Sequence, residues 1–214
     1  MRRVFELGGV VAAVILIAFG ITTIVMGLNG RSTVRDSIQQ EQIVGTPDMT
    51  PEATRAAAEE AGLDVSTLDI PSISVADEPI DTGEEARAFA GYLRIHALES
   101  TGGLTYSQMG RFVAADDPEN VAGTSDEEAA LKDEEGNPVP NTARNTWVTA
   151  TALTTALNMS YMAEQLSLFS IIIGIALFLA GIGFGILAIG GALRNPDTAL
   201  TFLRRRQAVP ARNS

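Results

Sequence analysis

The sequence contains one histidine, His96, which is the residue best suited to acid–base chemistry near neutral pH. Tyr92 and Glu99 lie within one helical turn of it and are the kind of polar neighbours that a general base uses. A serine-type triad also needs a nucleophile and an orienting acid, and no G-x-S-x-G nucleophile elbow is present. We therefore expect His96 to be a half-buried structural residue on a helix, beside Leu93 and Ile95.

The acidic residues do not form a recognisable metal site. Three acidic runs, 116–119, 126–128 and 133–135, lack the D-x-D-x-D-G-x5-E spacing that arranges oxygen ligands around calcium. The absence of cysteine excludes disulfides, thiolate metal sites and a cysteine nucleophile. Asn158-Met159-Ser160 matches a glycosylation sequon, which we interpret as a chance match. We expect no metal, no cofactor and no enzymatic activity.

Two long uncharged stretches dominate the chain. Residues 166–193 contain 28 residues without a charge, and residues 7–28 contain 22. A helix needs about 20 apolar residues to cross a bilayer core. The first stretch follows Met1-Arg2-Arg3 as a secretory signal would, but it is longer than a signal core and no clear processing site follows it. We predict two transmembrane helices, the first a retained signal anchor.

The charges flanking these stretches predict their orientation. Residues 31–165 carry 24 Asp and Glu against 8 Arg and Lys, a net charge of −16. Arginines precede the first stretch, and Arg194 and a triple arginine follow the second. Positive residues favour the cytoplasmic side, so we predict a two-span cell-membrane protein with both termini in the cytoplasm. The acidic middle argues against nucleic acid as a partner.

Helix signals recur in the region between the two stretches. Thr50 and Thr82 are predicted N-caps, each before a run of good helix formers, and Gly62 and Gly102 mark the ends of those helices. In the second helix, Ala86, Phe89, Leu93 and Ala97 share one face, with Tyr92, Ile95 and His96 beside it. Residues 73–76 alternate in polarity, so the sequence leaves a short edge strand as an alternative to irregular structure in this segment.

A stalk helix is predicted from Asn141 onward. No proline or glycine occurs between Thr142 and Ile173, so the helix should continue into the second span as far as Leu193. Its outer half carries apolar residues that must pack on other elements: Trp147, Leu153, Leu157, Tyr161 and Met162. We expect the partners to be an extension of the first span, through Val34 and Ile38, and the helix that contains Phe89 and Leu93.

These elements define a mainly α architecture, in which two transmembrane helices flank a small helical extracytoplasmic domain and the second span continues an outer stalk. The predicted boundaries are a cytoplasmic N-terminus at 1–6, the first span at 7–28, the acidic outer domain at 29–165, the second span at 166–193 and a basic cytoplasmic tail at 194–214. Within the outer domain we expect a flexible loop at about 115–140 and the stalk at 141–165.

Small residues within the spans are candidates for helix packing. Gly181 and Gly185 form a G-x-x-x-G pattern, Gly174 precedes them, and Gly8 and Ala12 form a small-xxx-small pair. Glycine is also simply frequent in membrane helices, so the alternative that these residues have no special role stays open. No ionisable residue interrupts either apolar stretch, which argues against a pore or transporter built from this chain alone.

Several runs carry a resemblance to a known group: RRVFELGGVVA, GRSTVRDSIQQEQIVGTPDMTPEA, YLRIHALESTGGLTYSQMGR and ARNTWVTATALTTALNMSYMAEQL. With these runs the chain resembles uncharacterised two-span membrane proteins of actinobacteria, which often carry the label of aromatic ring-opening dioxygenase. The resemblance implies topology and no established activity. Some members of the group carry cysteines at the positions of Ile73 and Ala88, which this chain lacks. A facial-triad iron site needs two histidines, so the dioxygenase label does not fit this chain.

We expect an accessory or scaffold subunit that sits in the lipid bilayer and presents its outer domain to another membrane or envelope protein, or to further copies of itself. The alternative is an extracytoplasmic ligand-binding or sensing module. The 21 residues after Leu193 are too few for a signalling domain, which weakens that alternative.

Overall fold

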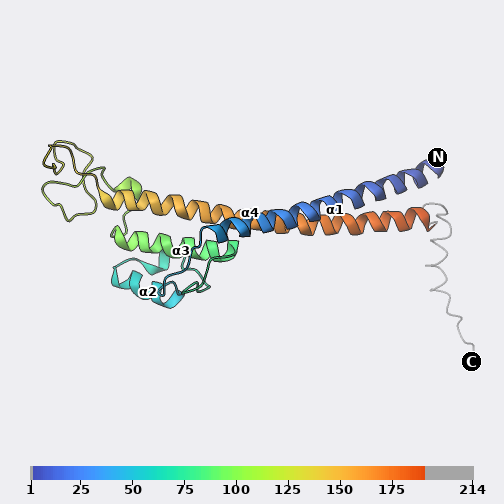
Figure 1. The fold of residues 1–214 in the computed structure, drawn as a ribbon, viewed down its shortest axis with the longest axis horizontal. Helices are drawn as coiled ribbons and strands as arrows, with labels where there is room; N and C mark the ends of the chain where they lie inside the picture. The colour runs from blue at the N-terminus through green and yellow to red at the C-terminus, as the bar shows by residue number, and fades with distance from the viewer. Residues whose placement is uncertain (1, 191–214) are drawn as a thin grey trace, which may run out of the picture. The chain divides into compact units, whose positions relative to one another are not determined.

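The structure is a computed structural model, and it describes residues 2–190. The predicted tail at 194–214 and the last residues of the second predicted span lie outside the described residues. The described chain is mainly helical, with α1 (Arg2–Gln40), α2 (Pro51–Glu60), α3 (Gly83–Ser100) and α4 (Thr142–Ile189) (Figure 1). Two 3₁₀ turns, Val65–Thr67 and Tyr106–Gln108, complete the elements. The helical fold class predicted from the sequence is confirmed at this level.

Two of the helices are candidates for membrane spans. By length and composition, α1 from Glu6 and the whole of α4 are apolar enough to cross a membrane. In the most apolar 18-residue segment of each helix, only 11% of the residues in α1 and 17% of those in α4 are buried inside the structure. The protein itself therefore leaves most of those apolar side chains uncovered. In the core helix of a soluble protein, most of them would be buried.

The chain divides into two compact units, residues 1–31 with 166–214 and residues 32–165. In the first unit, the described parts of α1 and α4 run side by side in opposite directions (Figure 1). The second unit contains α2, α3, the C-terminal end of α1 and the N-terminal half of α4.

The helix ends in the second unit follow local sequence signals. Thr50 accepts a hydrogen bond from the backbone N–H of Ala53 and caps α2, and Thr82 and Glu85 form a reciprocal capping box at the start of α3. Asn141 caps α4 by accepting from the N–H of Ala143, so the helix proper begins at Thr142. Each of these caps satisfies backbone donors that a helix start leaves unpaired.

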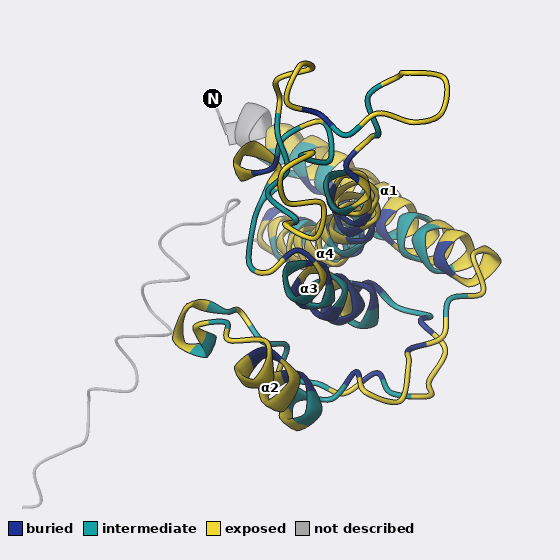
Figure 2. Cartoon of the chain, turned by 90° about the vertical axis from the view of Figure 1, so that its left-hand side faces the viewer, coloured by how far each residue is buried: buried dark blue, intermediate teal, exposed yellow. Residues whose placement is uncertain are grey.

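The core of the second unit surrounds α3, which is mostly dark blue and teal in Figure 2. Tyr92 is 0% exposed and Ile95 is 2% exposed, whereas Leu93 is only partly buried. Ala86, Phe89 and Ala97 of the predicted core face are buried, and Leu93 packs against both core clusters, but Tyr92, predicted beside that face, is buried more deeply than Leu93. The predicted face assumes one packing partner, but α3 is enclosed by the 71–80 segment on one side and α4 on another, so more than one of its faces is buried.

The stalk residues separate into packed and exposed positions. Leu157 belongs to the main cluster with Ile38 and Phe89, and Trp147 belongs to a second cluster with Ala97. The expected packing of the stalk on these partners is thus present within the second unit. Leu153 is 40% exposed and Met162 is 61% exposed, so the expectation that they pack was wrong. Both line open hollows beside α3, Leu153 next to Leu93 and Met162 in a hollow with Arg94.

The segment between α3 and α4 lacks regular secondary structure but its backbone groups pair. Isolated antiparallel bridges join Phe112 to Thr124 and to Pro140, and Ala114 to Ala130. The edge strand left open at 73–76 is reduced to a single bridge between Gly45 and Ala76. A Cβ at Gly45 would overlap the carbonyl oxygen of Val75, so this close backbone approach requires glycine.

Candidate functional site

His96 lies on α3 with a partner that is remote in sequence. Its Nε2 is 3.3 Å from Oδ2 of Asp48, and the two side chains are 25% and 61% exposed. The hydroxyl of Thr46 donates to Asp48, and this bond, a backbone hydrogen bond and the proximity of His96 hold the pKa of that carboxyl below its usual value, against the opposing effect of burial. The pair joins α3 to the segment before α2.

Tyr92, the neighbour that the sequence suggested for His96, has a different role. Its hydroxyl donates to the carbonyl oxygen of Ile73 at 2.7 Å. Burial, and to a smaller extent the nearby carboxylate of Glu52, raise the pKa of Tyr92 above its ordinary value. The residue thus fastens the 71–80 segment onto α3.

The acidic runs lie in exposed parts of the second unit. Within residues 2–190, no group of three or more His, Asp or Glu side chains is arranged to hold a metal ion. Asp126 and Asp133 instead accept hydrogen bonds from the backbone of their own turns, at Glu128 and Asn137. These carboxylates shape the loop locally.

The helix-packing candidates of the first unit differ in their surroundings. A Cβ at Gly174 would lie 2.8 Å from the carbonyl oxygen of Gly20, and a Cβ at Gly181 would lie 3.0 Å from that of Ala13. Gly185 lies in ordinary contact with the Cβ of Ala13. The backbones of α1 and α4 therefore approach closely where glycine faces them.

The other candidates make no comparable approach. Gly8 has no heavy atom within 4 Å of the position that a Cβ would take, and Ala12 is only partly buried. The residues that pack are spaced by seven: Ala13, Gly20 and Gly27 on α1, and Ser167, Gly174 and Gly181 on α4. A period of seven keeps one face of each helix toward the other. A search for small residues four positions apart does not detect it.

A buried carboxylate joins three helices of the second unit. Glu164 is 7% exposed; its Oε1 lies 2.9 Å from Nε of Arg35 on α1, and its Oε2 accepts the backbone N–H of Gly83 at 2.6 Å. Gly83 is the first residue of α3, so the carboxylate also faces the positive end of that helix. No sequence signal indicates this junction, because its members are far apart along the chain.

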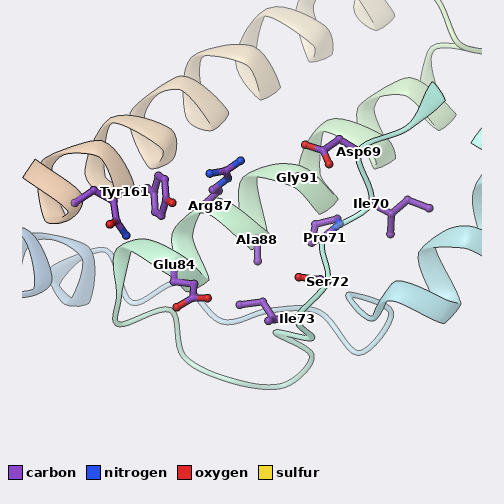
Figure 3. Close-up of a pocket in the computed structure, with 11 residues that line it drawn as sticks. Asp69, Ile70, Pro71, Ser72, Ile73, Glu84, Arg87, Ala88, Gly91 and Tyr161 are labelled. Carbon is purple, nitrogen blue, oxygen red and sulfur yellow. The ribbon is translucent and has the colours of Figure 1, made fainter. Parts of the chain in front are cut away.

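Two hollows of the second unit lie between α3 and α4, and a third lies on α4 beside Tyr106. One, of about 420 Å³, is bounded by the 69–73 segment, Glu84, Arg87 and Tyr161 (Figure 3). A second, of about 890 Å³, shares Asp69, Arg87 and Tyr161 with the first and continues past Arg94. A third, of about 530 Å³, shares two threonines of α4 with the second and ends among apolar side chains. We call these three hollows together the α3–α4 groove.

The arginines of this region lie against aromatic rings. Arg87 and Tyr161 lie next to each other in Figure 3, and the guanidinium carbon of Arg87 is 4.8 Å from the centre of the Tyr161 ring. That of Arg94 is 5.2 Å from the centre of the Trp147 ring. Arg144 stands 3.9 Å from the ring of Tyr106. Such stacking orients a guanidinium while leaving its N–H groups available at the edge.

None of these three arginines has a carboxylate oxygen of the described chain within 4.0 Å. The Nε of Arg144 is also buried without a hydrogen-bond partner among the described residues. This is unusual in a segment where acidic residues outnumber basic ones three to one. Sequence reasoning missed the cluster, because single arginines in an acidic region give no local pattern.

Comparison with known proteins adds no identification: no protein-family model, no curated protein and no solved structure matches this chain.

Proposed function

We propose that this chain is a two-span integral membrane protein whose residues 29–165 form an extracytoplasmic docking domain for another membrane or envelope protein. In this proposal α1 and α4 span the cell membrane, and the arginines at both ends of the sequence lie in the cytoplasm. The lipid bilayer covers the exposed apolar side chains of the first unit. The chain works as an accessory or scaffold subunit and has no enzymatic role and no nucleic-acid partner.

The charge distribution supports the orientation. Seven arginines and only two acidic residues lie outside residues 31–165 and the apolar stretches, and loops rich in arginine are retained on the cytoplasmic side. The acidic domain carries a net charge of −16, and acidic segments meet no comparable barrier to translocation.

The observation that carries the docking role is the unfilled side of the second unit. This unit has its own core around Tyr92, yet α4 leaves Val148 47% exposed in the α3–α4 groove and Met159 56% exposed elsewhere on the helix. A stalk helix that served only to hold the domain would need no exposed apolar side chains on this part of α4.

Cysteine labelling tests the topology, because the chain has no cysteine of its own. Ser125→Cys, in the exposed part of the second unit, should react with a membrane-impermeant maleimide in intact cells. Ser214→Cys should react only after lysis. Labelling of Ser125→Cys only after lysis would overturn the proposed orientation.

Crosslinking in cells tests the docking role. A photoreactive amino acid in place of Val148 should give a covalent adduct, whereas the same group in place of the exposed Glu59 on α2 should not. An adduct of twice the mass of the chain would identify the partner as a second copy. Equal adducts at both positions, or none at either, would argue against a specific docking face.

The size of the groove favours one alternative, a ligand-binding or sensing module. A hollow of about 890 Å³ is large enough for a small molecule, although it is open to solvent along one side. In that case a bound small molecule would shield the residues of the groove from chemical labelling. The photoreactive group in place of Val148 would then form no adduct with a protein.

A further inference from the structure

We propose that the α3–α4 groove binds a carboxylate-bearing peptide segment of a partner protein. This inference rests on the proposed docking function and names the chemistry of the partner. It is drawn from three features of the groove: its unpaired arginines, its row of hydrogen-bond acceptors and its apolar end.

The arginines provide the first feature. Arg87 and Arg94 line the groove together with the carboxylates of Asp69 and Glu84, and Arg144 stacks on Tyr106 at its apolar end. None of the three arginines has a carboxylate oxygen of the described chain within 4.0 Å. The chain has 24 acidic side chains in this region, so pairing these arginines internally would have been easy. Guanidinium groups stacked on rings present their N–H edge, which matches a carboxylate in bidentate geometry.

The spacing of the two groove arginines suits an extended chain of ligand groups. Arg87 and Arg94 are seven residues apart on α3, so their backbone positions are separated by about 10 Å along the helix axis. That distance equals about three residues of an extended peptide. A single compact anion would reach only one of them.

Polar groups of α4 supply the second feature. The hydroxyls of Thr154 and Thr155 donate to the carbonyl oxygen of Thr151, and the side-chain amide of Asn158 donates to that of Thr154. The two hydroxyl donors and one of the two N–H donors of the Asn158 amide are therefore used within the helix, and the side-chain oxygens of these groove-lining residues are left to accept. A peptide backbone offers N–H donors at regular intervals and fits such a row.

The third feature distinguishes a peptide from an acidic polysaccharide. The end of the groove near the start of α4 is lined by Tyr106, Trp147, Val148 and Ala152, and Tyr106 and Val148 are 46% and 47% exposed. An aliphatic or aromatic side chain would bury apolar surface there. A uronic-acid polymer has carboxylates and hydroxyls but no apolar side chain to fill this end.

The test uses the full-length protein in lipid nanodiscs and fluorescent peptides in which glutamate alternates with leucine. Binding is followed by fluorescence anisotropy, with a peptide carrying glutamine in place of each glutamate as the control. We expect the glutamate peptide to bind at least about tenfold more tightly, and more weakly as salt rises. Arg87→Gln and Arg94→Gln should each weaken binding by about tenfold.

Arg55→Gln is the matched control variant. It makes the same charge change on α2, where Arg55 is exposed and does not line the groove, so binding should be unaltered. Val148→Asp should weaken the glutamate peptide by filling the apolar end with a like charge.

Three outcomes would overturn the inference. The first is equal binding of the glutamate and glutamine peptides, and the second is equal loss in the Arg55→Gln and Arg94→Gln variants. The third is tighter binding of an oligogalacturonate than of the peptide, with no effect of Val148→Asp, which would assign the groove to an acidic polysaccharide. If crosslinking at Val148 nevertheless captures a partner in cells, the docking function stands and only the acidic chemistry fails.

Discussion

Replacing Leu157 by alanine should destabilise the second unit strongly. Leu157 is 5% exposed and packs in the main cluster with Ile38 and Phe89, so its truncation removes buried methyl groups and leaves a cavity. Leu→Ala changes at such sites cost about 2–5 kcal/mol, and we expect about 3 kcal/mol here. With a urea dependence of about 2 kcal/mol per molar, the unfolding midpoint of this unit should fall by about 1.5 M.

The same substitution at Leu153 is the control. Leu153 lies one helical turn before Leu157 on α4 and is 40% exposed, so its truncation should cost less than about 1 kcal/mol. Alanine has the same helix propensity at both positions, and the comparison therefore isolates the packing. Pulse proteolysis of the reconstituted protein across a urea series measures both. Equal midpoints for the two variants would refute the assignment of Leu157 to the core.

Three further predictions concern separate contacts. Tyr92→Phe keeps the buried ring but removes the hydrogen bond to Ile73, and it should cost about 1–2 kcal/mol of unfolding free energy in the same assay. Asp48 has a lowered pKa in the folded protein, so its ionised form stabilises the fold fully above the ordinary value of 3.8 and loses that effect as pH falls through the lowered value. Asp48→Asn should therefore be less stable than the native protein at neutral pH, with the difference disappearing in acid, and a constant difference across pH would contradict this. Gly174→Ala should lower the thermal unfolding temperature in detergent because its Cβ would lie 2.7 Å from a side-chain carbon of α1, whereas Gly183→Ala, with open space around it, should not.

Local chemistry explains why the sequence predicted the helices well. The caps at Thr50 and Thr82 use side chains within three residues of the bonds that they form, and the long uninterrupted stretch after Thr142 has neither proline nor glycine before the apolar run. Each of these signals acts over one or two helical turns. The helix ends that these signals predict therefore do not depend on the tertiary packing.

The candidate site depended on contacts that no local pattern records. Arg35 and Glu164 are 129 residues apart in the sequence, and Tyr92 reaches Ile73 across a loop. The complete burial of Tyr92 was missed for the same reason, since a helical wheel gives periodicity but not the number of neighbours that surround a helix. The α3–α4 groove and its arginines come together only when α3 and α4 pack in the folded protein.

The glycines between α1 and α4 have a consequence for the order of assembly. Each glycine in a helix interior costs about 1 kcal/mol relative to alanine, and Gly20, Gly27, Gly174 and Gly181 all lie in such interiors. In water, this cost would favour unfolding of the apolar segments. In lipid, unpaired backbone groups are so unfavourable that the helices form regardless of glycine content. If α1 and α4 span the bilayer as proposed, insertion must come first during biogenesis, and the close pairing of the two helices can follow only once both are in place.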